Sequence, residues 1–275
     1  MQRCYLTLGN GCQVHYRRAG KGAPVLMLHP SPLSSAFFEP LIEHLCVDFD
    51  VIAMDTPGYG CSDPLKSPGD DLAPYVEVIG EVLQSLSLSE ALLYGSATGT
   101  QLAIEAAKRY PGQIAGIVLE NAAAFSDTER EQMMEPYFPD LHACEDGSHL
   151  ALVWRIARQT FQYFPWYDAR EEARISDVPP SDMLVQATAM AYLIAGPDYA
   201  RAYKAAFANE RPEQLAAVEV PAKVMLWQDS PLLDYSRRLQ TATMPENIDF
   251  VEVGSGIETR YDAVRQALKD LWKLK

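Results

Sequence analysis

Several features are scarce or missing in this chain of 275 residues, and each absence excludes a class of protein. No apolar run approaches the roughly 20 residues that a membrane helix needs, and the N-terminal segment has no apolar stretch of the export-signal kind. Basic residues are in the minority, since 23 Lys and Arg stand against 37 Asp and Glu for a net charge of −14. Such a charge repels phosphate backbones and anionic lipids. We therefore expect a soluble cytoplasmic protein with neither a nucleic-acid nor a membrane partner.

Metal and cofactor motifs are also missing. The five cysteines are odd in number and have no C-x-x-C spacing, which predicts neither a disulfide framework nor a zinc site. There is no H-E-x-x-H, no Walker loop, and no Gly-x-Gly-x-x-Gly after the first predicted parallel strand. We expect no metal and no cofactor.

What is present is a repeated pattern of strand, turn and helix. Two short alternating segments, 4–8 and 13–17, flank a Gly-Asn-Gly turn and predict a hairpin at a sheet edge. Continuous apolar runs follow, separated by helical segments such as 72–86 and 98–110; the runs are PVLMLHP, VIAMDTPG, ALLYGS and IAGIVLEN. Continuous rather than alternating runs indicate parallel strands covered on both faces. The pattern predicts an α/β fold with a mostly parallel open sheet and helices on both faces.

A long helical, aromatic-rich stretch interrupts this pattern. The strand pattern stops after Asn121 and resumes at VPAKVMLWQDS and NIDFVEVGSG, and an amphipathic helix over 261–274 ends the chain. This arrangement predicts a core domain made of 1–123 and 218–275, with a helical cap inserted at 124–217.

Three motifs outside the cap resemble the α/β-hydrolase superfamily. LHPSPLSSAFF is similar to its His-Gly-x-Pro segment, MDTPGYGCSD to its Asp-x-Pro-Gly turn, and LLYGSATGTQLA to its nucleophile elbow, Gly-x-Ser-x-Gly. The resemblance implies an oxyanion hole formed by the backbone N–H groups of Ser31 and Thr98. It implies that His29 braces the oxyanion loop through hydrogen bonds. It also places His29 and Ser96 beside the substrate, with Ser96 as a turn residue rather than the nucleophile.

The sequence departs from the family pattern at the reactive positions. The centre of the elbow is Ala97, whose methyl group cannot attack a carbonyl. Asp229 is either the acid that family hydrolases carry after this strand or a plain loop carboxylate. Ile257 aligns with the late histidine, and no histidine follows His149. A Ser-His-Asp relay in its usual chain order is therefore not predicted. The DGSHL and FxxFPWYD segments resemble a bacterial subgroup with Gly-x-His-Thr-Gly at the elbow, which would put Ala97 in place of that histidine.

The predicted cap supplies the remaining candidates. His149 begins an aromatic helical segment and either reaches the elbow as a titratable partner of Asp229 or pairs with Asp146 on the surface. Four further cap residues either line a pocket for an apolar or aromatic substrate or pack the cap; they are Trp154, Arg158, Phe161 and Trp166.

Three hypotheses follow for the function. The first is an enzyme acting on a small apolar or aromatic carbonyl compound, by hydrolysis, C–C cleavage, or a lyase or cyclisation step, without a Ser-His-Asp triad. The second is a ligand-binding pseudoenzyme. The third is an inactive variant of an active hydrolase, with Ala97 replacing its reactive residue. In each case the partner is a small molecule, and the sequence leaves open whether the protein is a homodimer.

Overall fold

The computed structural model describes residues 1–273. Its centre is a twisted eight-stranded sheet in the order β1-β2-β4-β3-β5-β6-β7-β8. The first two strands form the expected hairpin, and β2 also pairs antiparallel with β4, whereas the pairs from β4 to β8 across the sheet are parallel. The strands are β1 (Gln2–Thr7), β2 (Gln13–Gly20), β3 (Ala23–Leu28), β4 (Phe49–Met54), β5 (Ala91–Ser96), β6 (Ile114–Glu120), β7 (Ala222–Trp227) and β8 (Ile248–Val253). The mostly parallel sheet predicted from the apolar runs is confirmed.

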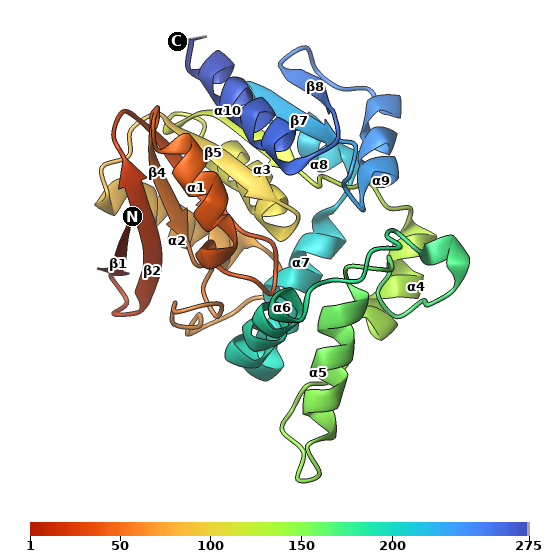
Figure 1. Ribbon diagram of the computed structural model, residues 1–275. Coiled ribbons are helices and arrows are strands. Elements are labelled where there is room, and N and C mark those ends of the chain that lie inside the picture. Colours follow the sequence, from red (N-terminus) through yellow and green to blue (C-terminus); the bar gives the residue numbers. More distant parts are fainter. Residues whose placement is uncertain (274–275) are drawn as a thin grey trace.

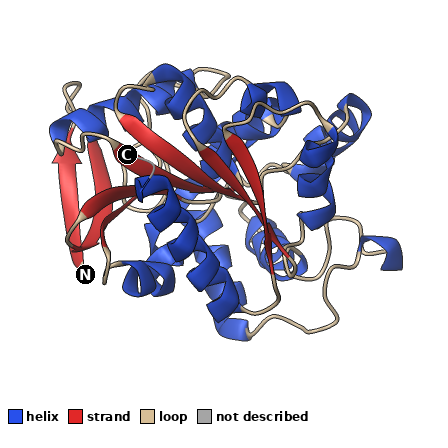
Figure 2. Ribbon diagram, turned by 90° about the horizontal axis from the view of Figure 1, so that it is seen from above, coloured by secondary structure: helices blue, strands red, loops and turns tan. Residues whose placement is uncertain are grey.

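Helices cover both faces of this sheet (Figure 2). Successive residues of β3 alternate between two apolar clusters: Leu26 and Leu28 pack on the side of α2 (Ala73–Ser85) and α3 (Thr98–Arg109). Val25 and Met27 pack on the side of α1 (Glu39–Leu45) and α10 (Ile257–Lys273). Because both faces are buried, the central strands contain almost no polar positions, which explains the continuous apolar runs.

A helical insertion separates β6 from β7, at the place in the chain where a cap is predicted. Its helices are α4 (Asp127–Tyr137), α5 (Ser148–Gln159), α6 (Asp182–Ala195), α7 (Arg201–Asn209) and α8 (Pro212–Ala216), with short 3-10 turns η2 (Glu171–Ala173) and η3 (Gly196–Ala200). The insertion has its own apolar cluster, rich in Phe and Tyr. Figure 1 shows α5 projecting away from the sheet, with its first turn at the outer tip. The domain boundaries at 124 and 217 stay a prediction.

The remaining short elements are η1 (Ser35–Phe38), α9 (Leu233–Arg237) and η4 (Arg238–Thr241). Among residues 1–273, no helix has both the length and the apolarity required to cross a bilayer. The carboxyl ends of β3 to β7 lie at one edge of the sheet, because these strands are parallel neighbours. In open parallel sheets this edge is where ligands bind, and the predicted site residues from the core lie on the loops that leave it.

Candidate functional site

The turn between β5 and α3 has the geometry of a nucleophile elbow. Ala97 has φ 48° and ψ −112°, a conformation that residues with a Cβ rarely adopt. Its N–H donates to the Glu120 carbonyl at 3.0 Å, and its own carbonyl accepts the Thr100 N–H at 2.9 Å. The turn is therefore held from β6 and from the first turn of α3, and it keeps its strained form although the side chain at its centre is a methyl group.

The two glycines of the motif are required by close backbone approach. A Cβ on Gly95 would lie 2.3 Å from the Gly99 carbonyl oxygen, and one on Gly99 would lie 1.9 Å from the Leu28 carbonyl oxygen. Both distances are far below van der Waals contact. Gly99 therefore lets the start of α3 press against the end of β3, where the predicted oxyanion loop begins.

The structure brings Ser31 and Thr98 together from positions 67 residues apart, since the Ser31 N–H donates to Thr98 Oγ1 at 3.3 Å. Thr98 is the first residue of α3, so its N–H has no partner inside the helix. Within residues 1–273 that N–H makes no hydrogen bond outside the helix either. The positive end of the helix dipole adds to its affinity for an oxygen bearing negative charge. The two predicted oxyanion donors are thus neighbours.

The contacts of His29 fit the expected role of bracing the oxyanion loop. Its side chain is fully buried, its Nε2 accepts the Thr56 N–H at 2.9 Å, and its Nδ1 then donates to the Pro30 carbonyl at 3.1 Å. Burial lowers the pKa of the ring, which keeps it neutral at physiological pH. With both nitrogens occupied, His29 braces the loop that carries Ser31.

A chain of polar side chains links the loops after β5, β6 and β7. Ser230 Oγ donates to Asn121 Oδ1 at 2.6 Å, and Asn121 Nδ2 donates to Ser96 Oγ at 3.1 Å. Ser96 is 1% exposed, which fits its predicted role as a turn residue. Asn121 and Ser230 were not among the predicted site residues. The position of each, as a polar residue soon after an apolar run, is the signal by which they could have been found.

Asp229 lies near the end of this chain but faces the loop after β8. It is exposed, and it accepts the Ser255 hydroxyl at 2.7 Å and the Gly256 N–H at 2.8 Å. These donors, the Ser255 hydroxyl first, hold the pKa of the carboxyl below its usual value. The residue that meets the acid is therefore Ser255, two positions before Ile257, whose side chain is exposed.

His149 is not brought to the elbow. It lies in the first turn of α5, the end of that helix farthest from the sheet (Figure 1), and its Nδ1 accepts the Cys144 N–H at 3.1 Å. The loop that precedes α5 is exposed to solvent. The predicted reach of His149 into a pocket is thus not supported, because α5 points its N-terminus away from the core.

The aromatic residues of this region mostly pack the insertion or face solvent. Trp154 and Arg158 are exposed, which corrects their predicted place inside a pocket. Trp166 is buried, and its Nε1 donates to the Tyr137 carbonyl at 3.0 Å, while Phe161 is half-buried. The buried stripe of α5 consists of Val153, Ile156 and Ala157. Because that stripe faces the insertion core, residues 154 and 158 necessarily point outward.

Polar groups buried inside the insertion were missed by the sequence reasoning. The hydroxyls of Tyr137 and Tyr203 lie 3.1 Å apart, and burial raises the pKa of Tyr137 to about 12. Glu210 is 6% exposed, and burial raises the pKa of its carboxyl well above the ordinary value. Its Oε2 has no hydrogen-bond partner within residues 1–273. Neither the helical spacing nor the composition distinguishes these residues from surface ones.

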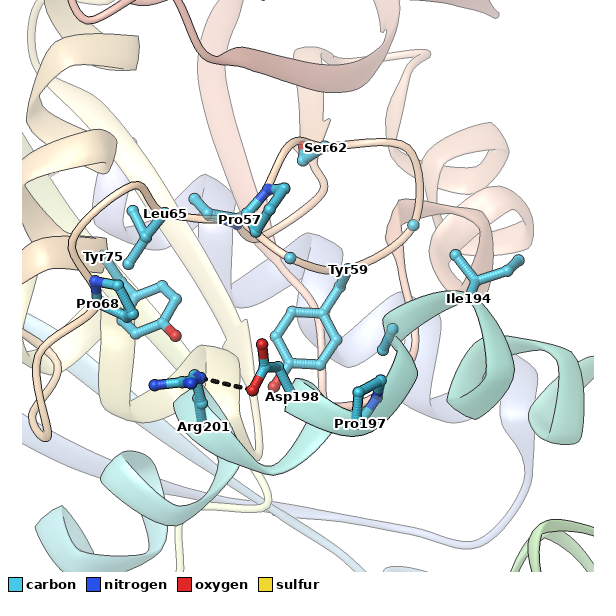
Figure 3. A pocket seen from close by; sticks show the side chains of 14 residues that line it. Pro57, Tyr59, Ser62, Leu65, Pro68, Tyr75, Ile194, Pro197, Asp198 and Arg201 are labelled. Carbon is cyan, nitrogen blue, oxygen red and sulfur yellow. Dashed lines mark hydrogen bonds and ion pairs between the residues drawn. The ribbon is translucent and has the colours of Figure 1, made fainter. Parts of the chain in front are cut away.

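Figure 3 shows a cavity between the Asp-x-Pro-Gly loop and the insertion, with a volume of about 220 Å³. Tyr59, Tyr75, Asp198 and Arg201 are among its lining residues, and the Arg201–Asp198 ion pair lies at its edge. Tyr59 lines the cavity, its ring lies 5.9 Å from the His29 ring, and its hydroxyl donates to the Tyr199 carbonyl. The residues of the elbow do not line this cavity.

Comparison with known proteins agrees with this geometry. A family model described as the alpha/beta hydrolase fold matches residues 23–141. An uncharacterised hydrolase of Saccharomyces cerevisiae is 34% identical over 120 residues, which are 43% of this chain and 41% of the yeast protein. The 2-(acetamidomethylene)succinate hydrolase of Mesorhizobium japonicum is 30% identical over 122 residues, 44% of each chain. The chain thus matches less than half the length of these curated relatives.

Solved structures extend the likeness to the whole chain at the level of the fold. An esterase from a Rhodococcus species superimposes with a TM-score of 0.71 at 22% identity, covering 98% of this chain and all of the esterase. This chain has the elbow, the adjacent Ser31 loop and the sheet order described above. The fold of the solved structure and the partial sequence matches agree with these features. The chain has the α/β-hydrolase fold, and residues 23–141 resemble the family model of that fold in sequence.

Proposed function

We propose that this protein is a hydrolase of small apolar or aromatic carbonyl compounds that works without covalent attachment at position 97. The observation that carries the proposal is the contact between the Ser31 N–H and Thr98 at the first turn of α3. A carbonyl oxygen that displaced Thr98 Oγ1 from Ser31 would meet two backbone donors fixed by the elbow. Donors held in place before the reaction stabilise the negative charge that develops on such an oxygen.

The methyl group of Ala97 leaves water as the nucleophile in this proposal. The water oxygen forms the bond to the carbonyl carbon, and the leaving group departs with a proton. The chain from Ser96 through Asn121 to Ser230 offers hydroxyl and amide groups that can orient the water. Asp229, next to Ser230, is the proposed proton acceptor. Hydrolysis is favoured over C–C cleavage, lyase or cyclisation chemistry because the matched relatives named above are hydrolases and an esterase.

The test removes one backbone donor. Thr98→Pro deletes the N–H at the first helical position, which has no partner inside the helix, and Thr98→Val keeps the N–H but loses the hydroxyl. With 4-nitrophenyl acetate and phenylacetate esters as probes, we expect kcat/KM to fall about 100- to 1000-fold in the proline variant. The valine variant should stay within about tenfold of the original chain. Circular dichroism melting establishes that both variants fold, and equal losses in the two would contradict the oxyanion role.

Ala97→Ser is the complementary test. It introduces the serine hydroxyl that the family motif has at the centre of the elbow, but it adds no histidine to act as a base. We therefore expect no acyl-enzyme in mass spectra and less than about a tenfold change in ester turnover. A large gain in turnover with a stable acyl adduct would show that the site retains a working base, and the proposal would be wrong.

A second candidate function is ligand binding without turnover, and the methyl group at the elbow favours it. It predicts saturable binding of an aromatic acid or ester by calorimetry with no product over hours. The third hypothesis, an inactive variant of an active hydrolase, is tested by reading codon 97 of the natural gene.

A further inference from the structure

Three side chains with metal-binding chemistry meet on the far side of β4 from the elbow strand. His15 lies in β2, Asp55 directly follows β4, and Cys61 lies in the turn after it. One ligand atom from each lies within 4.8 Å of the others. His15 is 3% and Asp55 1% exposed, whereas Cys61 is exposed. The group thus has two ligands fixed in the protein and one at its surface.

The surrounding hydrogen bonds fix the orientation of two of these side chains. His15 Nδ1 donates to Asp55 Oδ2 at 2.9 Å. The same carboxylate accepts the Cys61 N–H at 2.9 Å and, on its other oxygen, the Ser35 N–H at 2.7 Å. Ser62 Oγ accepts the His15 N–H at 2.9 Å and donates to the Asp55 carbonyl at 2.7 Å. Bonds of this kind around a metal site orient its ligands and raise its affinity.

The donor set is one nitrogen, one oxygen and one sulfur, which suits a divalent ion of intermediate softness. Ligands of a tetrahedral zinc ion lie about 3.3 to 3.8 Å from one another at normal bond lengths. The His15 and Asp55 atoms must therefore move apart by about half an ångström, while Cys61 approaches from the exposed turn. A thiolate and a carboxylate together neutralise a divalent ion, so the buried part of the site would hold no net charge. The chain's overall charge of −14 also attracts cations.

We propose that His15, Asp55 and Cys61 form a binding site for a zinc-like divalent cation, with water as the fourth ligand. On binding, the Cys61 thiol releases its proton to solvent and a metal–sulfur bond forms. The proton of His15 moves from Nδ1 to Nε2, so that the Nδ1 lone pair binds the metal in place of its hydrogen bond to Asp55 Oδ2. The site is separate from the elbow and does not depend on the proposed hydrolase activity.

The two exposed cysteines provide a matched pair of variants for the test. Cys61 belongs to the proposed site, and Cys144 lies on the exposed loop before α5. The full chain, freed of metal with a chelator, is titrated with Zn²⁺ against a chromophoric chelator and with Co²⁺ by absorption, where thiolate ligation gives a near-ultraviolet charge-transfer band. We expect one equivalent to bind, a Co²⁺ band, and a thermal midpoint raised by several degrees when Zn²⁺ is added.

Cys61→Ser should weaken Zn²⁺ binding by at least about 100-fold and abolish the band, because losing a ligand costs more than losing a residue that only orients one. The variant keeps the Cys61 backbone N–H that Asp55 accepts, and its melting curve in chelator verifies that it folds. Cys144→Ser should bind like the original chain. The proposal is overturned if no saturable Zn²⁺ binding occurs in the micromolar range, if the band persists in Cys61→Ser, or if it disappears in Cys144→Ser instead.

Discussion

Replacing Ala97 by glycine should stabilise the protein although it removes a methyl group. The conformation of Ala97, φ 48° and ψ −112°, costs a residue with a Cβ about 1–3 kcal/mol. Glycine adopts it freely, but its extra freedom in the unfolded chain costs about 0.4–1 kcal/mol. Burial of the half-exposed methyl contributes less than about 0.8 kcal/mol. The balance is a gain of about 1 kcal/mol, or about 2–3 °C in the midpoint of thermal unfolding for a chain of this size.

The assay is thermal and urea unfolding of Ala97→Gly beside Ala151→Gly. Ala151 is exposed within α5, in ordinary helical geometry, so the same substitution there should destabilise by about 1 kcal/mol. The two variants are therefore expected to shift stability in opposite directions. If Ala97→Gly loses as much unfolding free energy as Ala151→Gly, the backbone at the elbow is relaxed and the strain argument fails.

Three other predictions follow from buried groups. Gly99→Ala should destabilise by about 3 kcal/mol, because its Cβ would meet the Leu28 carbonyl oxygen at 1.9 Å; a loss below 1 kcal/mol in urea unfolding would contradict this. Arg260→Met should cost about 3–5 kcal/mol, since it leaves Glu120, which is 2% exposed and accepts Arg260 at 2.7 and 2.6 Å, buried without its cation. Adding Glu120→Gln should recover part of that loss, and a double variant as unstable as the single one would argue against it. Burial raises the pKa of Glu210 above its ordinary 4.5, so the folded state holds the proton longer than the unfolded state, and stability falls as pH rises from 4.5 to the folded pKa. Glu210→Gln should remove that fall in unfolding free energies measured from pH 4 to 8; an unchanged slope would contradict it.

The sequence alone was sufficient for the core of the fold. Continuous apolar runs are a direct result of strands buried on both faces, and the structure has parallel strands at these runs. The elbow was also readable, since the Gly-x-x-x-Gly spacing around Ala97 reflects close approach within a few residues. Ser31 and Thr98 were predicted as partners only through the family resemblance, because nothing in either segment specifies the other.

The direction of side chains in the insertion could not be predicted from the sequence. Aromatic residues at helical spacing give the same sequence pattern whether their side chains face a pocket, a core or solvent. Trp154 and Arg158 proved to be exposed, and His149 lies at the outer tip, because the packing of α5 on its neighbours decides which stripe is buried. The predicted substrate contacts of the insertion therefore found no support.

The elbow's strained turn and the sheet were determined by the sequence itself, because periodicity and glycine spacing act over short distances along the chain. The tertiary structure alone decided which distant groups became neighbours. It joined Ser96 to Asn121 and Ser230, and His15 to Asp55 across 40 residues. The sequence carries no spacing signal for such contacts. The first set arises because parallel strands bring their loops to one edge of the sheet, and the second because β2 pairs antiparallel with β4.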